Sequence, residues 1–286
     1  MQMNKSKSGQ VVLNAPYLLW SVLFIVVPLI FVVYYAFTNS DGGFTFSNVS
    51  TFFTSSTYMT VFWRSIVYAL WATAICLLIA YPFAYCMAKV NISSQRMLML
   101  LVMLPMLMNL IVRTYSWQQI LERNGIVNKL FEAFGLPTVS FLGNAAVIVF
   151  GMVYNYLPFM ILPIYSSISK VDKSLLEASS DLGCNAFGTV RRVILPMSIP
   201  GILSGITMVF VPCVSTFYIS RQFSDGNIKM IGDVIEDKFY KSSVPDYNIG
   251  ATISLVLMLI ILISLAVVNK FSDGDDDGVG SGGVVI

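Results

Sequence analysis

The chain contains no histidine among its 286 residues, and only 11% of its side chains are charged. The lack of histidine excludes an H-E-x-x-H zinc site and any mechanism that uses an imidazole base. Soluble domains carry about 25% charged side chains, so the low charge excludes an ordinary soluble fold. A net charge of +2, with scattered lysines and arginines, also argues against nucleic-acid binding.

Cysteine motifs and phosphate loops are missing as well. The four cysteines show neither C-x-x-C nor zinc spacing, so we interpret them as small packing residues: Cys76, Cys86, Cys184 and Cys213. The sequence has no G-x-x-x-x-G-K-[ST] loop, which binds nucleotide phosphates in many ATPases. We therefore expect no catalytic residue, no metal site, no cofactor and no ATP hydrolysis in this chain.

Apolar residues dominate what is present. Hydrophobic side chains make up 56% of the chain, and the mean hydropathy is +0.76. A transmembrane helix needs about 20 apolar residues, and six runs qualify: residues 11–37, 61–88, 97–119, 143–167, 198–220 and 250–269. The first run is too long for a removable signal segment. The sequence predicts an all-α, polytopic membrane protein with six transmembrane helices.

The predicted membrane domain covers residues 11–270, between an N-terminal tail (1–10) and an acidic, glycine-rich tail (271–286) that we expect to be disordered. Its orientation follows from the basic residues of the early loops. Lys5 and Lys7 precede the first span, and Lys89 and Arg96 follow the second, whereas residues 38–63 contain none. Basic loops stay in the cytoplasm. Both termini and residues 168–197 are therefore predicted to be cytoplasmic.

A polar segment interrupts the apolar runs at residues 173–196. Its first half has helical spacing, and Gly183 is expected to end that helix at positive φ, which costs glycine no Cβ clash. A second helix is expected from about Ala186, closed by Pro196, because proline cannot continue the backbone hydrogen bonding. The segment is predicted to form a helix, a turn and a helix.

This segment resembles the cytoplasmic signature of ABC importer permease subunits, E-A-A-x-x-x-G followed after a spacer by I-x-L-P. Glu177, Ala178, Gly183, Leu195 and Pro196 match it in register. Ser179, Cys184 and Val193 replace an alanine, an alanine and an isoleucine. The resemblance implies a type I permease fold in which this loop, with Asp181, contacts the ATPase. Alternatively, Ser174 and Glu177 form a capping box, which explains the glutamate without a partner.

Further stretches resemble the spermidine/putrescine permeases of this family: AYPFAYCMAK (80–89), LPFMILPIYSSISKVDKSLLEASSDLG (157–183), FYIS (217–220) and IGDVIEDKF (231–239). The resemblance implies a polyamine importer in the bacterial cytoplasmic membrane. Its other parts would be a second homologous permease, two copies of an ATPase that hold ATP and magnesium, and an extracellular or periplasmic substrate-binding protein. A permease for another small solute remains an alternative.

Charged side chains are nearly absent from the predicted spans. No Asp or Glu lies in them, which argues against a proton- or sodium-driven carrier, although a channel or carrier without an ATPase stays open. An intramembrane enzyme lacks a base or metal ligands. Arg113 is the exception in the third span. It pairs with an outer carboxylate, reaches the interface, has a structural role or contacts the substrate, and we favour the interface or a structural role over substrate contact.

Aromatic and acidic residues gather at the predicted outer ends of the spans. We expect a polyamine path along six of them, because aromatic faces and carboxylates attract ammonium groups: Tyr115, Trp117, Tyr154, Tyr218, Asp233 and Glu236. An interfacial aromatic belt below a solvated acidic loop explains the same residues without a substrate.

Overall fold

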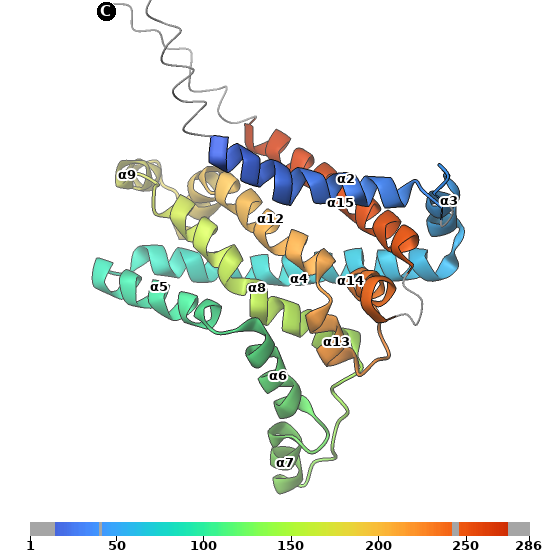
Figure 1. The fold of residues 1–286 in the computed structure, drawn as a ribbon. Coiled ribbons are helices and arrows are strands. Elements are labelled where there is room, and N and C mark those ends of the chain that lie inside the picture. The colour runs from blue at the N-terminus through green and yellow to red at the C-terminus, as the bar shows by residue number, and fades with distance from the viewer. Residues whose placement is uncertain (1–14, 40–41, 242–245, 274–286) are drawn as a thin grey trace, which may run out of the picture. The chain divides into compact units, whose positions relative to one another are not determined.

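The computed structural model describes residues 15–39, 42–241 and 246–273 (Figure 1). Every regular element in this part of the chain is helical, apart from an isolated antiparallel bridge between Thr38 and Phe44. The predicted all-α fold is therefore confirmed. The expected tail 1–10 lies outside the described residues. Of the tail 271–286, only the first three residues are described, and they form the end of a helix.

The described residues contain four helices that are long and apolar enough to span a membrane: Ala15–Ala36, α4 (Ser56–Lys89), α8 (Ala145–Ile168), and Tyr247–Val268 of α15 (Tyr247–Asp273). Two further pairs of helices are each bent at a short break, and the number rises to six if each pair counts as one span. Ile92–Leu107 and Leu110–Ala133 meet at 88°, and Ala186–Met197 and Ile199–Ser215 meet at 66°. Four of the six predicted spans are therefore single long helices, and the third and fifth fall within the two bent pairs.

The third predicted span, 97–119, is broken after Leu107. α5 (Ile92–Leu107) ends there, and Met108 and Asn109 have extended backbones before α6 (Leu110–Leu121) begins. The Asn109 side chain accepts a hydrogen bond from the Ile111 amide at 2.8 Å and so caps α6. The apolar residues continue on both sides of this point, and the cap at Asn109 marks where α6 begins.

The fifth predicted span, 198–220, also ends early. α12 (Ile199–Ser215) stops before Thr216, which has ψ of 138°, and α13 (Tyr218–Ser224) then starts a new helix. Pro212 lies three residues before the end of α12 and removes one of its backbone hydrogen bonds. The last residues of the predicted span therefore belong to a separate short helix.

The chain divides into two compact units, Met1–Met59 with Val234–Leu259, and Thr60–Asp233 with Ile260–Ile286. The first unit includes η1 (Val22–Val26), α2 (Val27–Ala36), α3 (Ser47–Thr54), η3 (Asp237–Lys241) and the start of α15. Ala36 and Ala251 pack in its core. Asn248 Nδ2 donates to the Thr38 carbonyl at 2.6 Å, and Thr252 Oγ1 donates to the Ala36 carbonyl at 3.2 Å. Polar side chains of α15 thus satisfy carbonyls at the end of α2.

The second unit contains most of α4 and all helices from α5 to α13, including α7 (Ile126–Ala133). Its central contact joins α12 to α8. A Cβ added to Gly201 would lie 2.4 Å from Ser167 Oγ, and one added to Gly205 would lie 2.7 Å from the Met160 sulfur. The two glycines of this G-x-x-x-G sequence therefore permit close packing inside the chain itself.

Candidate functional site

The polar segment forms the predicted helix, turn and helix at one end of the second unit (Figure 1). It comprises α9 (Lys173–Asp181), α10 (Ala186–Thr189), the π-helical turn η2 (Val190–Ile194) and α11 (Leu195–Met197). The second helix runs as Ala186–Met197, so Pro196 lies in its last turn, one residue before its end, and the bend falls at Ser198.

The start of α9 differs from the predicted capping box. Asp172 is the N-cap, and its carboxylate accepts a hydrogen bond from the Ser174 amide at 3.0 Å. This bond, together with one from the Ser174 side chain, holds the pKa of Asp172 below its ordinary value. Ser174 lies inside the helix, so it is not the N-cap that the alternative requires. Capping of α9 therefore does not explain why a glutamate stands at position 177.

The turn after α9 has the geometry expected of Gly183, with φ of +77°. The Gly183 amide donates to the Ser180 carbonyl at 2.9 Å, and the Cys184 amide donates to the Ser179 carbonyl at 3.1 Å. These two bonds are the Schellman pattern that ends many helices. No atom lies within 4 Å of an added Cβ. Backbone conformation, rather than lack of space, is therefore what requires glycine here.

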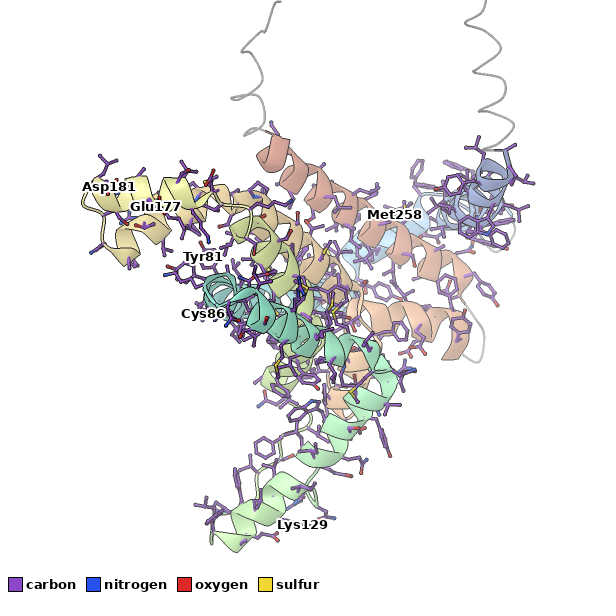
Figure 2. All side chains as sticks on the ribbon, turned by 90° about the vertical axis from the view of Figure 1, so that its left-hand side faces the viewer. Tyr81, Cys86, Lys129, Glu177, Asp181 and Met258 are labelled. Carbon is purple, nitrogen blue, oxygen red and sulfur yellow. The ribbon has the colours of Figure 1, made fainter. Side chains whose placement is uncertain are left out.

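The signature residues of α9 face outward. Glu177, Ala178 and Asp181 are exposed, whereas Ser179 is buried. Figure 2 shows Glu177 and Asp181 at the opposite end of the second unit from Lys129 on α7. Glu177 and Asp181 are four residues apart, which places them on one helix face. This face is free to meet another protein.

A polar hollow of about 570 Å³ opens beside the turn, lined by Leu182, Gly183, Cys184, Asn185, Phe187, Gly188, Arg191 and Arg192. Leu182 and Phe187 are 86% and 74% exposed, which is unusual for large apolar side chains beside a polar hollow. Asn185 caps α10 by accepting from the Gly188 amide at 2.7 Å. The sequence analysis missed this hollow, although the asparagine two residues after Gly183 is a recognisable cap signal.

The two remaining signature residues lie at the bend. Leu195 is 40% exposed and Pro196 is also exposed. Ser198 is buried beside them, and its hydroxyl lies 3.3 Å from the Tyr81 hydroxyl of α4. The end of the loop is thereby joined to a long helix of the same unit.

Two of the four predicted aromatic path residues are in contact. The Trp117 ring meets the Tyr154 ring edge-on at 5.3 Å between centroids, and it meets Phe150 at 5.0 Å. The Tyr218 hydroxyl donates instead to the Ile111 carbonyl at 3.4 Å. Tyr115 is 51% exposed. The structure therefore brings together Trp117 on α6 and Tyr154 on α8, with Phe150 added to the predicted set.

The predicted acidic residues have different surroundings. Asp233 is 5% exposed, and one of its carboxylate oxygens accepts from the Ser220 hydroxyl at 2.7 Å and the Met230 amide at 2.8 Å. Glu236 belongs to the first unit and is half-buried. Through these two hydrogen bonds Asp233 holds the segment after α13 in position, and its side chain is buried.

The cysteines have mixed surroundings. Cys76 and Cys213 are buried, in line with small packing residues, whereas Cys86 on α4 is exposed (Figure 2). Among the described residues no group of three or more metal-binding side chains occurs.

Comparison with known proteins shows which family, relatives and solved structures this chain is similar to. The sequence profile described as "Binding-protein-dependent transport system inner membrane component" matches residues 77–273. The spermidine/putrescine transport system permease protein PotB of Haemophilus influenzae is 34% identical over 252 residues, covering 85% of this chain and 88% of that protein. PotB of Escherichia coli is 32% identical over 256 residues, covering 87% and 92%. The fold is similar to a chain of a bacterial alginate ABC transporter, solved with its alginate pentasaccharide-bound periplasmic protein. The TM-score is 0.76 at 17% identity, covering 95% of this chain and 97% of that one.

Proposed function

The chain belongs to the family of inner membrane components of binding-protein-dependent transport systems, and we propose that it is a permease subunit of an ATP-driven polyamine importer. It is a multi-pass membrane protein and a transporter component rather than an enzyme. The observation that carries the proposal is the exposed α9, which presents Glu177 on a helix capped by Asp172 and ended by Gly183.

The ATPase contact is proposed for the exposed face of α9 and the turn after it. Glu177, Ala178 and Asp181 supply the helix face, and Gly183 sets the direction in which the chain leaves it. Leu195 and Pro196 connect the loop to the bend before α12. Caps at Asp172 and Asn185 and the turn at Gly183 define the ends of its helices. We expect a loop held in this way to transmit a movement of the ATPase.

The substrate proposal rests on the PotB relatives, whose names state spermidine/putrescine transport. We assign the path to the aromatic residues Tyr115, Trp117, Tyr154 and Tyr218, whose ring faces attract ammonium groups. Asp233 adds negative charge from beneath the surface. Glu236 is included on sequence grounds alone. A permease for another small solute is the alternative.

The assembly is proposed to contain a second homologous permease and two copies of an ATPase that bind ATP and magnesium. A periplasmic or extracellular substrate-binding protein delivers the polyamine. The fold neighbour solved with a periplasmic protein supports such a partner. We propose that both termini and the 168–197 loop lie in the cytoplasm of a bacterial cell, where ATP is available.

Reconstitution tests the proposal. The tagged chain is purified with its co-expressed partners, placed in liposomes, and assayed for uptake of radiolabelled spermidine and putrescine with ATP inside. ATP-dependent uptake that requires the binding protein supports the proposal. Purification without a nucleotide-binding subunit, together with ATP-independent flux, would indicate a channel or carrier. ATP-dependent uptake of a neutral or anionic solute in place of polyamines would remove the substrate assignment only.

A further inference from the structure

Arg113 is a buried cation without a carboxylate partner among the described residues. It is 6% exposed, and its guanidinium has two partners, the Pro105 carbonyl and the ring of Tyr154. It therefore does not pair with an outer carboxylate in the described residues, and its two contacts within the chain favour a structural role over the other sequence alternatives. Ionisable groups inside membrane spans are costly, and their presence calls for a functional explanation.

The first partner lies at the break in the third span. Pro105 is in the last turn of α5, and its carbonyl already accepts a hydrogen bond from the Met108 amide at 3.3 Å. Arg113 Nη1 donates to this carbonyl from the first turns of α6. A cation at the carboxyl end of a helix is also favoured by the helix dipole. Arg113 thus holds α5 and α6 together across their 88° bend.

The second partner lies on α8. The Arg113 guanidinium carbon is 5.6 Å from the centroid of the Tyr154 ring, within the range of a cation–π contact. Trp117 follows Arg113 by one helical turn on α6, and Phe150 precedes Tyr154 by one turn on α8, so each pair shares a helix face. Arg113 and Trp117 both contact the Tyr154 ring, and together they restrict its orientation.

The Tyr154 ring lines a hollow of about 670 Å³ between α4 and α8, and Trp117 packs against that ring. Phe150 and Tyr154 line it from α8, and Tyr68 and Trp71 line it from α4. Its surface is almost entirely apolar, so aromatic faces are the main groups in it that can attract an ammonium ion. The orientation of Tyr154, which Trp117 contacts, therefore sets the aromatic face that this residue offers in the hollow.

We propose that Arg113 is a positioning residue for transport, which fixes the Trp117–Tyr154 pair as an aromatic face for the cationic substrate by joining the end of α5 to Tyr154. This inference rests on the proposed polyamine path. A competing effect has the opposite sign, because the positive charge of Arg113 also repels an approaching cation. If positioning dominates, removal of Arg113 weakens substrate binding. If repulsion dominates, its removal strengthens substrate binding.

The test uses the assembled importer in nanodiscs or liposomes, with Arg113→Gln, Arg113→Lys and the control Arg123→Gln. Arg123 is exposed in the turn between α6 and α7 and is not an aromatic contact, so its loss removes the same charge without disturbing the rings. We expect Arg113→Gln to raise the KM for spermidine uptake roughly fivefold to tenfold, the effect of losing one aromatic contact with a cation. Arg113→Lys should raise this KM less than Arg113→Gln does, and Arg123→Gln should leave the KM equal to that of the parent.

A second readout reports the rings directly. In a protein whose Trp20, Trp63 and Trp71 are replaced by phenylalanine, Trp117 is the sole tryptophan. Arg113→Gln should increase acrylamide quenching of its fluorescence, and Arg113→Lys should do so less. Unchanged quenching, or a KM that stays equal or falls, would overturn the proposal. If the parent complex carries no polyamine, the substrate assignment fails, whereas the quenching measurement still decides whether Arg113 positions Trp117.

Discussion

The hydroxyl groups of Ser179 and Thr189 lie 2.9 Å apart and join the two helices of the polar segment 173–196. Ser179 occupies the position of the second alanine in the family signature, and it is buried, whereas its neighbours on α9 are exposed. Its side chain therefore points into the loop while Glu177 and Asp181 point out of it. The loop is held as one body by this bond and by the turn at Gly183.

Gly183→Val should abolish ATP-dependent uptake while the protein still reaches the membrane. A β-branched residue at φ of +77° is strained by about 1–2 kcal/mol, so the turn is expected to change direction. Gly183→Asn is the matched control, because asparagine tolerates this backbone region and the site has open space. Equal uptake by the valine and parent proteins would show that the turn geometry is not needed for coupling.

Glu177→Ala and Asp172→Ala should both reduce uptake, but for different reasons. Asp172 caps α9, so its loss should loosen residues 173–181, detected as faster hydrogen exchange. Glu177 makes no capping bond, and its loss should leave hydrogen exchange unchanged while weakening co-purification of the ATPase. Faster exchange after Glu177→Ala, with the ATPase still bound, would return this residue to a role within its own helix.

The cap at Asp172 predicts a pH dependence of α9. The pKa of Asp172 is lowered in the folded protein because its ionised form accepts the Ser174 amide, so the stabilisation is present above the unfolded pKa. It is lost as pH falls through the lower, folded pKa. A spin label at position 178 should become more mobile in acid. Asp172→Asn keeps a cap that does not titrate, and it should remove this change.

Single cysteines test the orientation of the membrane domain. Ser47→Cys and Ser93→Cys, each in a protein without the four native cysteines, place thiols at exposed positions on opposite predicted sides. An impermeant thiol reagent added to intact cells should label only position 47. Permeabilised cells should label both positions. Labelling at 93 in sealed cells would place the α9 loop outside and remove the ATPase contact.

Asp233→Asn should lower protein stability more than it alters substrate affinity. The buried carboxylate accepts two hydrogen bonds, from Ser220 and Met230, and both lose charge assistance in the amide. We expect a loss of about 1–2 kcal/mol, measured by thermal unfolding in detergent. Asp225→Asn, exposed in the same segment, is the control. A changed KM at unchanged stability would instead support direct contact of Asp233 with the substrate.

The sequence predicted well those features that depend on a few neighbouring residues. Gly183 followed a helical pattern, and its positive φ was expected from that position alone. The alternative capping box placed the N-cap at Ser174, two residues late, because Asp172 and Ser174 are both good caps and only the fold selects between them. The break after Leu107 was missed because apolar residues continue on both sides of it.

Long-range contacts could not be predicted from the sequence for a different reason. Nothing near Arg113 in the sequence indicates Tyr154 as its partner, because that contact depends on how α6 meets α8. The burial of Asp233 likewise depends on Ser220, thirteen residues earlier on another helix. Such pairs require the arrangement of the helices, which a single sequence does not contain.

The break between α5 and α6 makes the protein sensitive to bilayer thickness. A helix of 16 residues rises about 24 Å, which is shorter than a hydrocarbon layer of about 30 Å. Met108 and Asn109 then carry extended backbone near that depth, where lipid offers no hydrogen-bond partners. Short-chain lipids match α5, whereas long-chain lipids force the membrane to thin around it. Transport in vesicles of graded acyl-chain length should therefore be fastest in the thinner bilayers.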